Sequence, residues 1–335
     1  MSNNSQKGYT LIELLVAMAL ALVVLAAVYR TFKSQHDSFI IQDQMAAMQQ
    51  NVRGAMHVLT RDLQLAGFYT NFDRNTRTLD WDDRDNDDDT TTGTEAIRPL
   101  IYAGNNVSAT GIKPDTDTIT IVKSGENREL QETESATSGG SGSATIYLSD
   151  WEDEGVTRDA LDLDGDGNVD LNTSTKKFGL LVKNDLRTAE FFEVQMSGSS
   201  ILPAGGLVNN YTTGDRICRV DVILYKLDAQ DNLVRRNLGN DVSDTPSILA
   251  ENIDNLQFRY QLNNGSWTDD PAGSEALVRA VQVFMLARSA HEHRGYSDTH
   301  SYDLADYPGD NPPNDRFRRR LLCSTVKTRN IGLTE

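Results

Sequence analysis

The first 67 residues combine two hydrophobic patterns, one continuous and one periodic. From Tyr9 to Tyr29 every residue is apolar except Thr10 and Glu13. A helix of that length rises about 31 Å, which is enough to cross a bilayer. After it, apolar residues recur every three or four positions, as on one face of a helix. They are Ile41, Met45, Met48, Val52, Ala55, Leu59, Leu63 and Ala66. The pattern predicts one helix from about Thr10 to Ala66 with Gly67 as its stop.

From Pro99 onward the pattern changes to short runs of β-branched and aromatic residues separated by Gly, Asn and Asp, which predicts antiparallel strands. The clearest runs are Thr118–Val122, Thr145–Leu148, Phe178–Val182, Ala189–Val194, Ile217–Leu227, Leu256–Leu262, Leu277–Ala287 and Leu321–Thr328. No run after residue 29 is long and apolar enough to span a membrane. The predicted fold class is α+β: a long helix, membrane-spanning in its first half and amphipathic in its second, packed on a β-rich head.

Two stretches contain few residues that favour regular structure. Residues 82–95 are dense in Asp and Thr, and residues 134–144 are dense in Gly and Ser. Such compositions are typical of exposed loops. Both stretches are therefore predicted to be loops on the surface of the head.

The charge balance narrows the choice of partners. The chain has 335 residues, with 49 acidic and 32 basic side chains, and its formal net charge is −17. A polyanion would be repelled over most of such a surface, which argues against nucleic acid as a partner and favours cations. The mean hydropathy of −0.47 excludes several membrane spans. At most one segment is predicted to cross a membrane.

Glu13 is the unusual residue of the apolar segment. A carboxylate inside a membrane helix costs about 2–3 kcal/mol, and such residues generally find a polar partner or mark a function. The alternative is an ordinary secretory signal peptide, with Lys7 as its positive flank and cleavage near Ala19 or Ala21. The charge flanking the segment does not orient it, because Arg30 and Lys33 balance Lys7 and the amino terminus.

The run Lys7-Gly8-Tyr9-Thr10-Leu11-Ile12-Glu13-Leu14-Leu15-Val16-Ala17-Met18 resembles the class III leader junction of type IV pilins and type II secretion pseudopilins. The resemblance implies that a prepilin peptidase cleaves after Gly8 and methylates the new amine of Tyr9. It also implies that Glu13 pairs with the amine of a neighbouring subunit during assembly. Tyr9 stands where Phe is commoner, and Arg30 stands where major pilins tend to carry a proline.

The segment Arg53 to Tyr69 resembles the helix exit of PilW-type minor pilins and J-type pseudopilins. Three later segments resemble PilW-type chains: Leu249 to Tyr260, Val278 to Val281 and Arg320 to Asn330. The implied organisation is a leader at 1–8, a transmembrane and assembly helix at 9–29, an amphipathic helix at 30–67 and a head at 68–335. The implied location is the inner membrane, with a single pass, a cytoplasmic amino terminus and a periplasmic head. After assembly the subunit would stand in the pilus, at its tip.

The segment Asp162 to Thr173 fits the pattern of a calcium-binding loop. Alternate side chains of such a loop supply oxygen ligands, and a Gly at the sixth position allows the sharp turn. The ligand positions are taken by Asp162, Asp164, Asp166, Asn168 and Asp170, with Gly167 at the turn. Position 12 is Thr173 rather than an acidic residue, so Asp159 or Glu154 could complete the shell. The predicted cofactor is Ca²⁺, ordering a loop at 162–173; the alternative is an Asp/Gly turn without an ion.

Histidines and cysteines add little catalytic chemistry. His291, His293 and His300 form the only histidine cluster and are interpreted as solvated loop residues rather than a zinc site. Cys218 and Cys323 are the only cysteines. They form either a disulfide, which would close a long loop, or two buried thiols. No nucleophile or phosphate-binding motif is present, so the chain is not predicted to be an enzyme.

The preferred hypothesis is a PilW-like minor pilin that takes part in priming or capping type IV pilus assembly. Its implied partners are the prepilin peptidase, other minor pilins, the major pilin and the inner membrane. A J-type pseudopilin of a type II secretion system is the near alternative, although heads of that family are usually smaller. Two hypotheses of a different class are a membrane-anchored, Ca²⁺-dependent surface binding protein and a tethered hydrolase that uses the histidines.

Overall fold

The structure is a computed structural model of the chain. The residues described are 10–67, 101–132, 135–140, 143–147, 160–161, 171–172, 178–185, 188–197, 200–204, 206–237, 246–307 and 313–331. The chain divides into two compact units, residues 1–49 and 50–335, and each is described by itself. The stretch 82–95, predicted to be a loop, lies outside the described residues.

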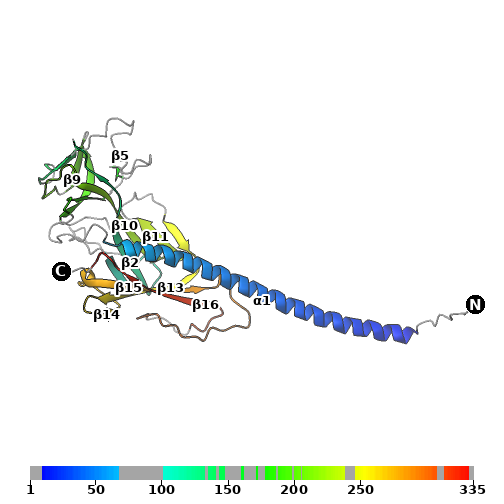
Figure 1. The fold of residues 1–335 in the computed structure, drawn as a ribbon. Helices are drawn as coiled ribbons and strands as arrows, with labels where there is room; N and C mark the ends of the chain where they lie inside the picture. Colours follow the sequence, from blue (N-terminus) through cyan, green and yellow to red (C-terminus); the bar gives the residue numbers. More distant parts are fainter. Residues whose placement is uncertain are drawn as a thin grey trace, which may run out of the picture. The chain divides into compact units, whose positions relative to one another are not determined.

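A single helix, α1 (Leu11–Leu65), contains both hydrophobic patterns (Figure 1). This confirms the predicted helix to within one residue at each end. In the first unit the apolar side chains from Leu11 to Phe32 are exposed all round the helix. A helix that is apolar on every face requires an apolar environment, either lipid or other helices.

In the second unit, the last four turns of α1 bury the predicted stripe. Val52, Ala55, Leu59, Leu63 and Ala66 are all buried. Each large apolar side chain removed from water contributes about 1.5–3 kcal/mol. The helix then stops at the predicted position, because Gly67 adopts a φ of 73°, which glycine reaches without strain. Its N–H donates to the carbonyl oxygen of Val122, 2.9 Å away.

In the described residues of the head, ten strands form one antiparallel sheet. Its order is β1-β2-β10-β7-β8-β9-β4-β3, with β11 pairing β10 and β12 pairing β11. The bounds are β1 (Ile101–Val107), β2 (Thr116–Glu129), β3 (Ser135–Thr137), β4 (Thr145–Tyr147), β7 (Phe178–Val182), β8 (Ala189–Ser197), β9 (Ser200–Ala204), β10 (Arg216–Leu227), β11 (Leu233–Asn237) and β12 (Ser247–Ala250).

The long strand β10 divides this sheet into two lobes. One of its edges pairs with β2 from Arg216 to Tyr225. On its other edge, Arg216 to Val220 pair with β7, whereas Ile223 to Leu227 pair with β11. One lobe therefore contains β7, β8, β9, β4 and β3, and the other contains β11 and β12.

A second antiparallel sheet has the order β14-β13-β15-β16. Its strands are β13 (Ile253–Leu262), β14 (Trp267–Thr268), β15 (Val278–Arg288) and β16 (Arg319–Lys327), and a short 3₁₀ turn, η2 (Glu275–Leu277), precedes β15. Residues 289–318 connect β15 to β16. Part of this loop, including Leu304, packs on Phe284 and Leu286 of β15. Strands β5 (Ala160–Leu161) and β6 (Leu171–Asn172) pair in a third, two-stranded antiparallel sheet.

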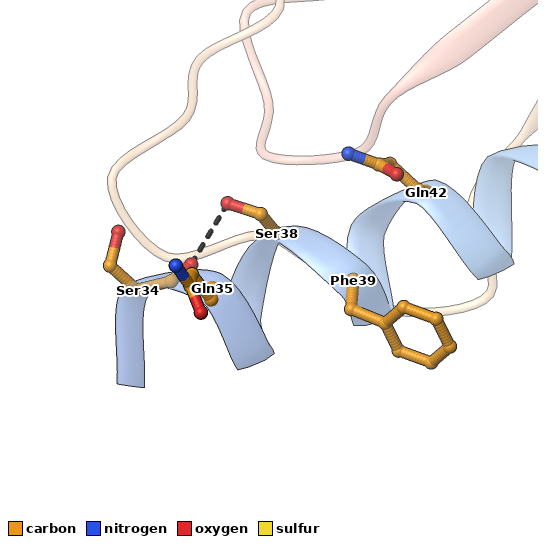
Figure 2. A pocket seen from close by; sticks show the side chains of 5 residues that line it. All are labelled: Ser34, Gln35, Ser38, Phe39 and Gln42. Carbon is orange, nitrogen blue, oxygen red and sulfur yellow. Dashed lines mark hydrogen bonds between the residues drawn. The ribbon is translucent and has the colours of Figure 1, made fainter. Parts of the chain in front are cut away.

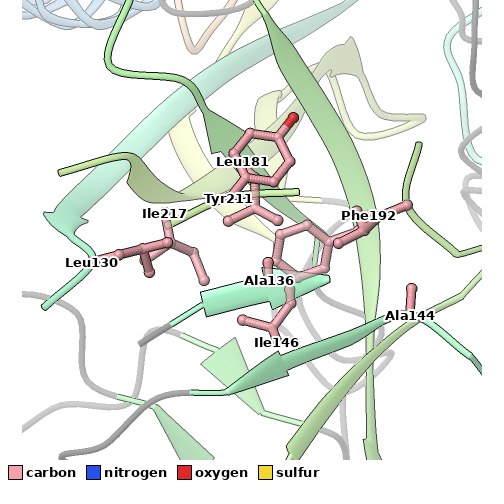
Figure 3. Close-up of a cluster of buried hydrophobic side chains, with 9 residues drawn as sticks. Leu130, Ala136, Ala144, Ile146, Leu181, Phe192, Tyr211 and Ile217 are labelled. Atoms are coloured by element: carbon pink, nitrogen blue, oxygen red, sulfur yellow. The ribbon is translucent and has the colours of Figure 1, made fainter. Parts of the chain in front are cut away.

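All eight predicted strands are present, and the predicted fold class is confirmed. The exposed-loop interpretation of residues 134–144 is wrong in part. Ala136, in β3, and Ala144 are buried in the apolar cluster that Figure 3 shows around Phe192 and Tyr211. The small residues of this stretch pack closely against large side chains. Its composition, rich in Gly and Ser, therefore wrongly indicated that the whole stretch is exposed.

Asp117 joins the two sheets through its buried carboxylate. Its Oδ1 accepts a hydrogen bond from the main-chain N–H of Asn106 in β1 (2.8 Å), and its Oδ2 accepts one from the N–H of Phe258 in β13 (2.7 Å). Burial raises the pKa of Asp117 to about 7; the two N–H donors oppose this rise, and the charges of Asp306 and Asp269 add to it. The carboxyl therefore binds a proton more readily in the folded head than in the unfolded chain.

Replacing Asp117 with asparagine is expected to destabilise the head, because an amide cannot accept from both N–H groups. An unsatisfied buried donor costs about 1–3 kcal/mol. Wild-type stability should also fall as the pH rises through about 7, where the folded carboxyl loses its proton, whereas Asp117→Asn has no such group. Urea unfolding at pH 5 and pH 8 checks this, and the stability difference between the two proteins should be larger at pH 5. A difference independent of pH would contradict this account.

Candidate functional site

Thr10 caps the start of α1, and Glu13 stands in the first turn of the helix. The side-chain oxygen of Thr10 accepts a hydrogen bond from the N–H of Glu13 (3.3 Å), and the Thr10 carbonyl accepts one from the N–H of Leu14 (3.2 Å). Thr-x-x-Glu is the spacing of a capping box. Glu13 is exposed and stands in the first turn, where a negative charge favours the helix. Gly8 and Tyr9, the predicted processing residues, lie outside the described residues.

The surface after Glu13 is a continuous apolar sleeve. Its exposed large side chains are Leu14, Leu15, Val16, Met18, Leu20, Leu22, Val23, Val24, Leu25, Val28, Tyr29 and Phe32. By length and composition, α1 is long and apolar enough to cross a membrane. The arrangement suits anchoring in a bilayer. It equally suits side-by-side packing with the helices of other subunits.

Farther along α1, a shallow depression is lined by polar side chains and one aromatic ring (Figure 2). Its residues are Ser34, Gln35, Ser38, Phe39 and Gln42, all from the helix itself. The Ser38 hydroxyl donates to the Ser34 carbonyl oxygen, 2.9 Å away. No ionisable side chain lines the depression, so it provides no group for acid–base chemistry.

In the head unit, Asp62 anchors the last turns of α1 to the large sheet. Its Oδ1 lies 2.7 Å from Nζ of Lys123 in β2. Its Oδ2 accepts hydrogen bonds from the Tyr225 hydroxyl of β10 (2.6 Å) and from Nε of Arg235 in β11 (3.0 Å). Asp62 itself is only 4% exposed. One carboxylate on the helix therefore ties together three neighbouring strands.

The charges around Asp62 favour its ionised form. Burial alone would raise the pKa of Asp62, but hydrogen bonds from Lys123, Tyr225 and Arg235 together outweigh burial, and the pKa falls below its ordinary value. The pKa of the Arg235 guanidinium is raised by Asp62 despite its burial. Asp62 lies in the segment Arg53 to Tyr69, whose family resemblance did not indicate this anchor. The available signal was an acidic residue at a helix position next to Leu59 and Leu63, two residues of the buried stripe.

The predicted calcium ligands Asp162, Asp164, Asp166, Asn168 and Asp170 lie outside the described residues. The two strands that flank them are described. Ala160 pairs with Asn172, and Leu161 pairs with Leu171. The chain is therefore antiparallel at the two ends of this segment, and the ends are held together.

The two cysteines do not form the disulfide that the sequence left open. Both thiols are free. Cys218 is buried in β10 among apolar residues of the large sheet, including Leu180 and Val220, whereas Cys323 is exposed in β16 of the other sheet. Burial raises the pKa of the Cys218 thiol to about 12, so it stays protonated and unreactive.

The three histidines have different environments. His293 is buried, and burial lowers its pKa. His291 and His300 are exposed, and Nδ1 of His300 lies 3.4 Å from the buried Asp298. Within the described parts of the chain, no three His, Cys, Asp or Glu side chains form a metal-binding group. The interpretation of all three as solvated residues is therefore wrong for His293.

Comparison with known proteins gives two family matches, one at each end of the chain. Residues 3–29 match the prokaryotic N-terminal methylation motif. Residues 222–330 match the family described as type IV pilus-assembly protein W, PilW. The second match covers β11 to β16 of the head and about half of β10.

Two individual proteins, both from Thermus thermophilus, are also similar. The pilin-like protein PilA3 is 44% identical over 62 residues, which are 18% of this chain and 27% of that protein. The chain therefore matches about a quarter of that relative's length. The solved structure of the type IV-like pilin TTHA1219 shares 16% identity, over 47% of this chain and 86% of the other, with a TM-score of 0.26. That score is too low to compare the two folds in detail.

The match to the methylation motif coincides with the start of the apolar helix α1, which precedes the antiparallel head. The PilW match lies in the head. Both ends of the chain are therefore similar to type IV pilin-like proteins, and the part of the head from residue 222 to residue 330 is similar to PilW, as the sequence predicted.

Proposed function

We propose that this chain is a minor pilin that takes part in priming or capping type IV pilus assembly. The observation that carries the proposal is the presence of a methylation motif and a PilW match in one chain. The exposed apolar sleeve of α1 supports it, because a pilin needs one surface that serves first in lipid and then among other helices. On this proposal the chain acts as a structural subunit and catalyses no reaction.

The proposed life of the subunit has two stages. A prepilin peptidase cuts after Gly8 and methylates Tyr9 while α1 stands in the inner membrane with the head in the periplasm. Glu13 then pairs with the amine of a neighbouring pilin, which offsets the cost of a carboxylate among apolar side chains. The mature subunit joins other minor pilins and the major pilin at the pilus tip.

Deleting the gene and counting surface pili by electron microscopy tests this function. Cells without the chain are expected to show far fewer pili, and plasmid-borne wild type should restore them. Immunogold particles directed at the head should lie at pilus ends. Normal piliation combined with failure to secrete type II substrates would instead identify a J-type pseudopilin. A strain normal in both respects would favour a membrane-anchored surface binding protein.

We further propose that the segment from Asp162 to Asp170 binds Ca²⁺ and becomes ordered around it. Clustered carboxylates repel one another until a cation neutralises them. The pairing of β5 with β6 supports this, because it brings the two ends of the segment together, as a closed loop requires.

Calcium titration followed by calorimetry tests the loop. Replacing Asp162, Asp164 and Asp166 together with asparagine should remove one Ca²⁺ per chain from the stoichiometry. Protection of residues 160–172 from limited proteolysis should then no longer depend on Ca²⁺. Asp228→Asn is the matched control, because Asp228 is a carboxylate of the described β10–β11 turn. Unchanged stoichiometry in the triple variant would contradict the loop proposal.

A further inference from the structure

Strand β16 forms one edge of the second sheet. In the described residues the order of this sheet is β14-β13-β15-β16, so β16 has β15 on one side and no strand on the other. Its register with β15 runs without a shift along all nine residues, from Arg319 to Lys327. The strand is therefore regular along its whole length.

Every second residue of β16 directs its main-chain groups away from β15. In an antiparallel pair, residues that exchange hydrogen bonds with the neighbouring strand alternate with residues that do not. The N–H of Thr328, just after β16, donates to the Arg279 carbonyl oxygen (3.0 Å), and the Arg318 carbonyl oxygen, just before β16, accepts from the N–H of Ser289 (2.8 Å). The even-numbered residues of β16 therefore bond β15. The residues with outward-pointing N–H and C=O groups are Leu321, Cys323, Thr325 and Lys327.

The other edges of the two larger sheets are short or irregular. Proteins generally protect sheet edges from unwanted pairing by short strands, bulges, proline or charged residues. Strands β3, β12 and β14 have three, four and two described residues, and β1 contains a register shift. From Leu321 to Val326, by contrast, β16 contains no proline, glycine or charged residue. This central segment of β16 is therefore open to pairing with another strand.

Basic side chains flank the central segment, although the chain as a whole is acidic. Residues 316–331 contain six basic side chains and no acidic one, whereas the formal net charge of the chain is −17. Arg320 stands at one end of the segment, and Lys327 and Arg329 stand at the other. All three are exposed, and in the described part of the chain no carboxylate forms an ion pair with them. The edge thus presents positive charge at both of its ends.

We propose that β16 binds an extended segment of another protein as an additional strand, and that this segment carries acidic side chains at both ends. Main-chain hydrogen bonds to the outward-pointing groups of β16 supply affinity in this mode of binding. Carboxylates beside Arg320 and Lys327 select the partner and fix its position along the strand. A second copy of β16 fits less well, because both of its ends are basic and like charges on paired strands repel.

Fluorescence anisotropy of a dye-labelled synthetic peptide tests the proposal on the full-length protein in a non-ionic detergent. The peptide is as long as β16, with alternating valine and threonine at its centre and glutamates at both ends. We expect saturable binding that weakens as salt is added, because salt screens exposed charges. The same peptide with lysines in place of the glutamates should bind at least about tenfold more weakly.

Thr325→Pro removes one outward-pointing N–H and leaves the hydrogen bonds to β15 in place. Proline is tolerated on an edge strand where its nitrogen faces solvent. This variant should bind the glutamate peptide at least about tenfold more weakly than wild type. Thr325→Val is the matched control, because it keeps the N–H and the β-branched side chain, and its affinity should equal that of wild type. Circular dichroism verifies that both variants are folded.

Reversing the charge of the edge gives a second test that an unfolded head cannot pass. The double variant Arg320→Glu with Lys327→Glu should lose the glutamate peptide and bind the lysine peptide instead. Alkylation by a maleimide locates the bound peptide, because Cys323 is exposed at the centre of the edge and Cys218 is buried. Bound glutamate peptide should slow the alkylation of Cys323 in wild type.

Three results would overturn the proposal. They are equal or absent binding of the two peptides, binding that Thr325→Pro does not weaken, and binding that leaves the alkylation rate of Cys323 unchanged. Sedimentation velocity tests the alternative occupant. Self-association that Thr325→Pro abolishes, in a protein that binds neither peptide, would show that a second copy pairs with β16. None of these results bears on the role of the chain as a minor pilin.

Discussion

Replacing Glu13 with alanine is expected to leave the chain anchored in the membrane and to remove it from assembled pili. The apolar surface of α1 is enough for anchoring and becomes more apolar in the variant. Assembly is different, because the Glu13 carboxylate is proposed to meet the amine of a neighbouring pilin in an apolar setting. Losing one partner of a buried charge pair costs about 3–5 kcal/mol. Incorporation into sheared pili, measured by immunoblot, should therefore fall at least about 100-fold.

Asp37→Ala is the matched control for this experiment. Asp37 is also an exposed acidic residue of α1, but it lies outside the apolar sleeve. Its replacement should leave both anchoring and incorporation unchanged. Wild-type levels of Glu13→Ala in pili would contradict the assembly role of Glu13. Loss of the variant from the membrane fraction would mean that Glu13 acts in insertion instead.

Replacing Asp62 with asparagine is expected to destabilise the head by about 3–5 kcal/mol, because it leaves the charges of Lys123 and Arg235 without their shared partner. The loss should depend on pH. The folded pKa of Asp62 lies below its ordinary value, so its contribution is complete above about pH 4 and fades as the pH falls through the folded pKa. Urea unfolding at pH 7 and pH 3 measures both effects, and the two proteins should be closer in stability at pH 3.

Asp43→Asn tests whether the loss of stability comes from the contacts of Asp62 or from removing any negative charge from α1. Asp43 is an exposed carboxylate of α1, and replacing it should change the unfolding free energy by less than about 0.5 kcal/mol. If Asp62→Asn were as stable as Asp43→Asn at pH 7, the three hydrogen bonds to Asp62 would contribute nothing net to the fold.

The regular parts of the fold were predictable because their patterns are local. The stripe from Val52 to Ala66 follows helical spacing, and the long strands, such as β10 and β15, are rich in β-branched residues. Other strands of the described head, such as β1, β3 and β9, were not predicted. Strand β1 contains Gly104, Asn105 and Asn106, which favour turns, and only its pairing with β2 makes it a strand. Tertiary context overrides local preference there.

The polar contacts could not be predicted, because they join residues far apart in the chain. Asp62 meets Tyr225 and Arg235 only once the sheet exists, and Asp117 meets Phe258 only once two sheets lie together. Their sequence neighbourhoods contain no motif. The methylation motif was predictable for the opposite reason, since it is a short linear segment. The match at residues 3–29 confirms that motif.

The mass and amino-terminal sequence of the membrane-extracted protein, from cells with and without prepilin peptidase, test the central claim most directly. If the chain is a processed pilin, the mature protein begins at N-methylated Tyr9 only when the peptidase is present, and Met1 is retained without it. Retention of Met1 in both strains, or cleavage near Ala19 or Ala21, would contradict the claim.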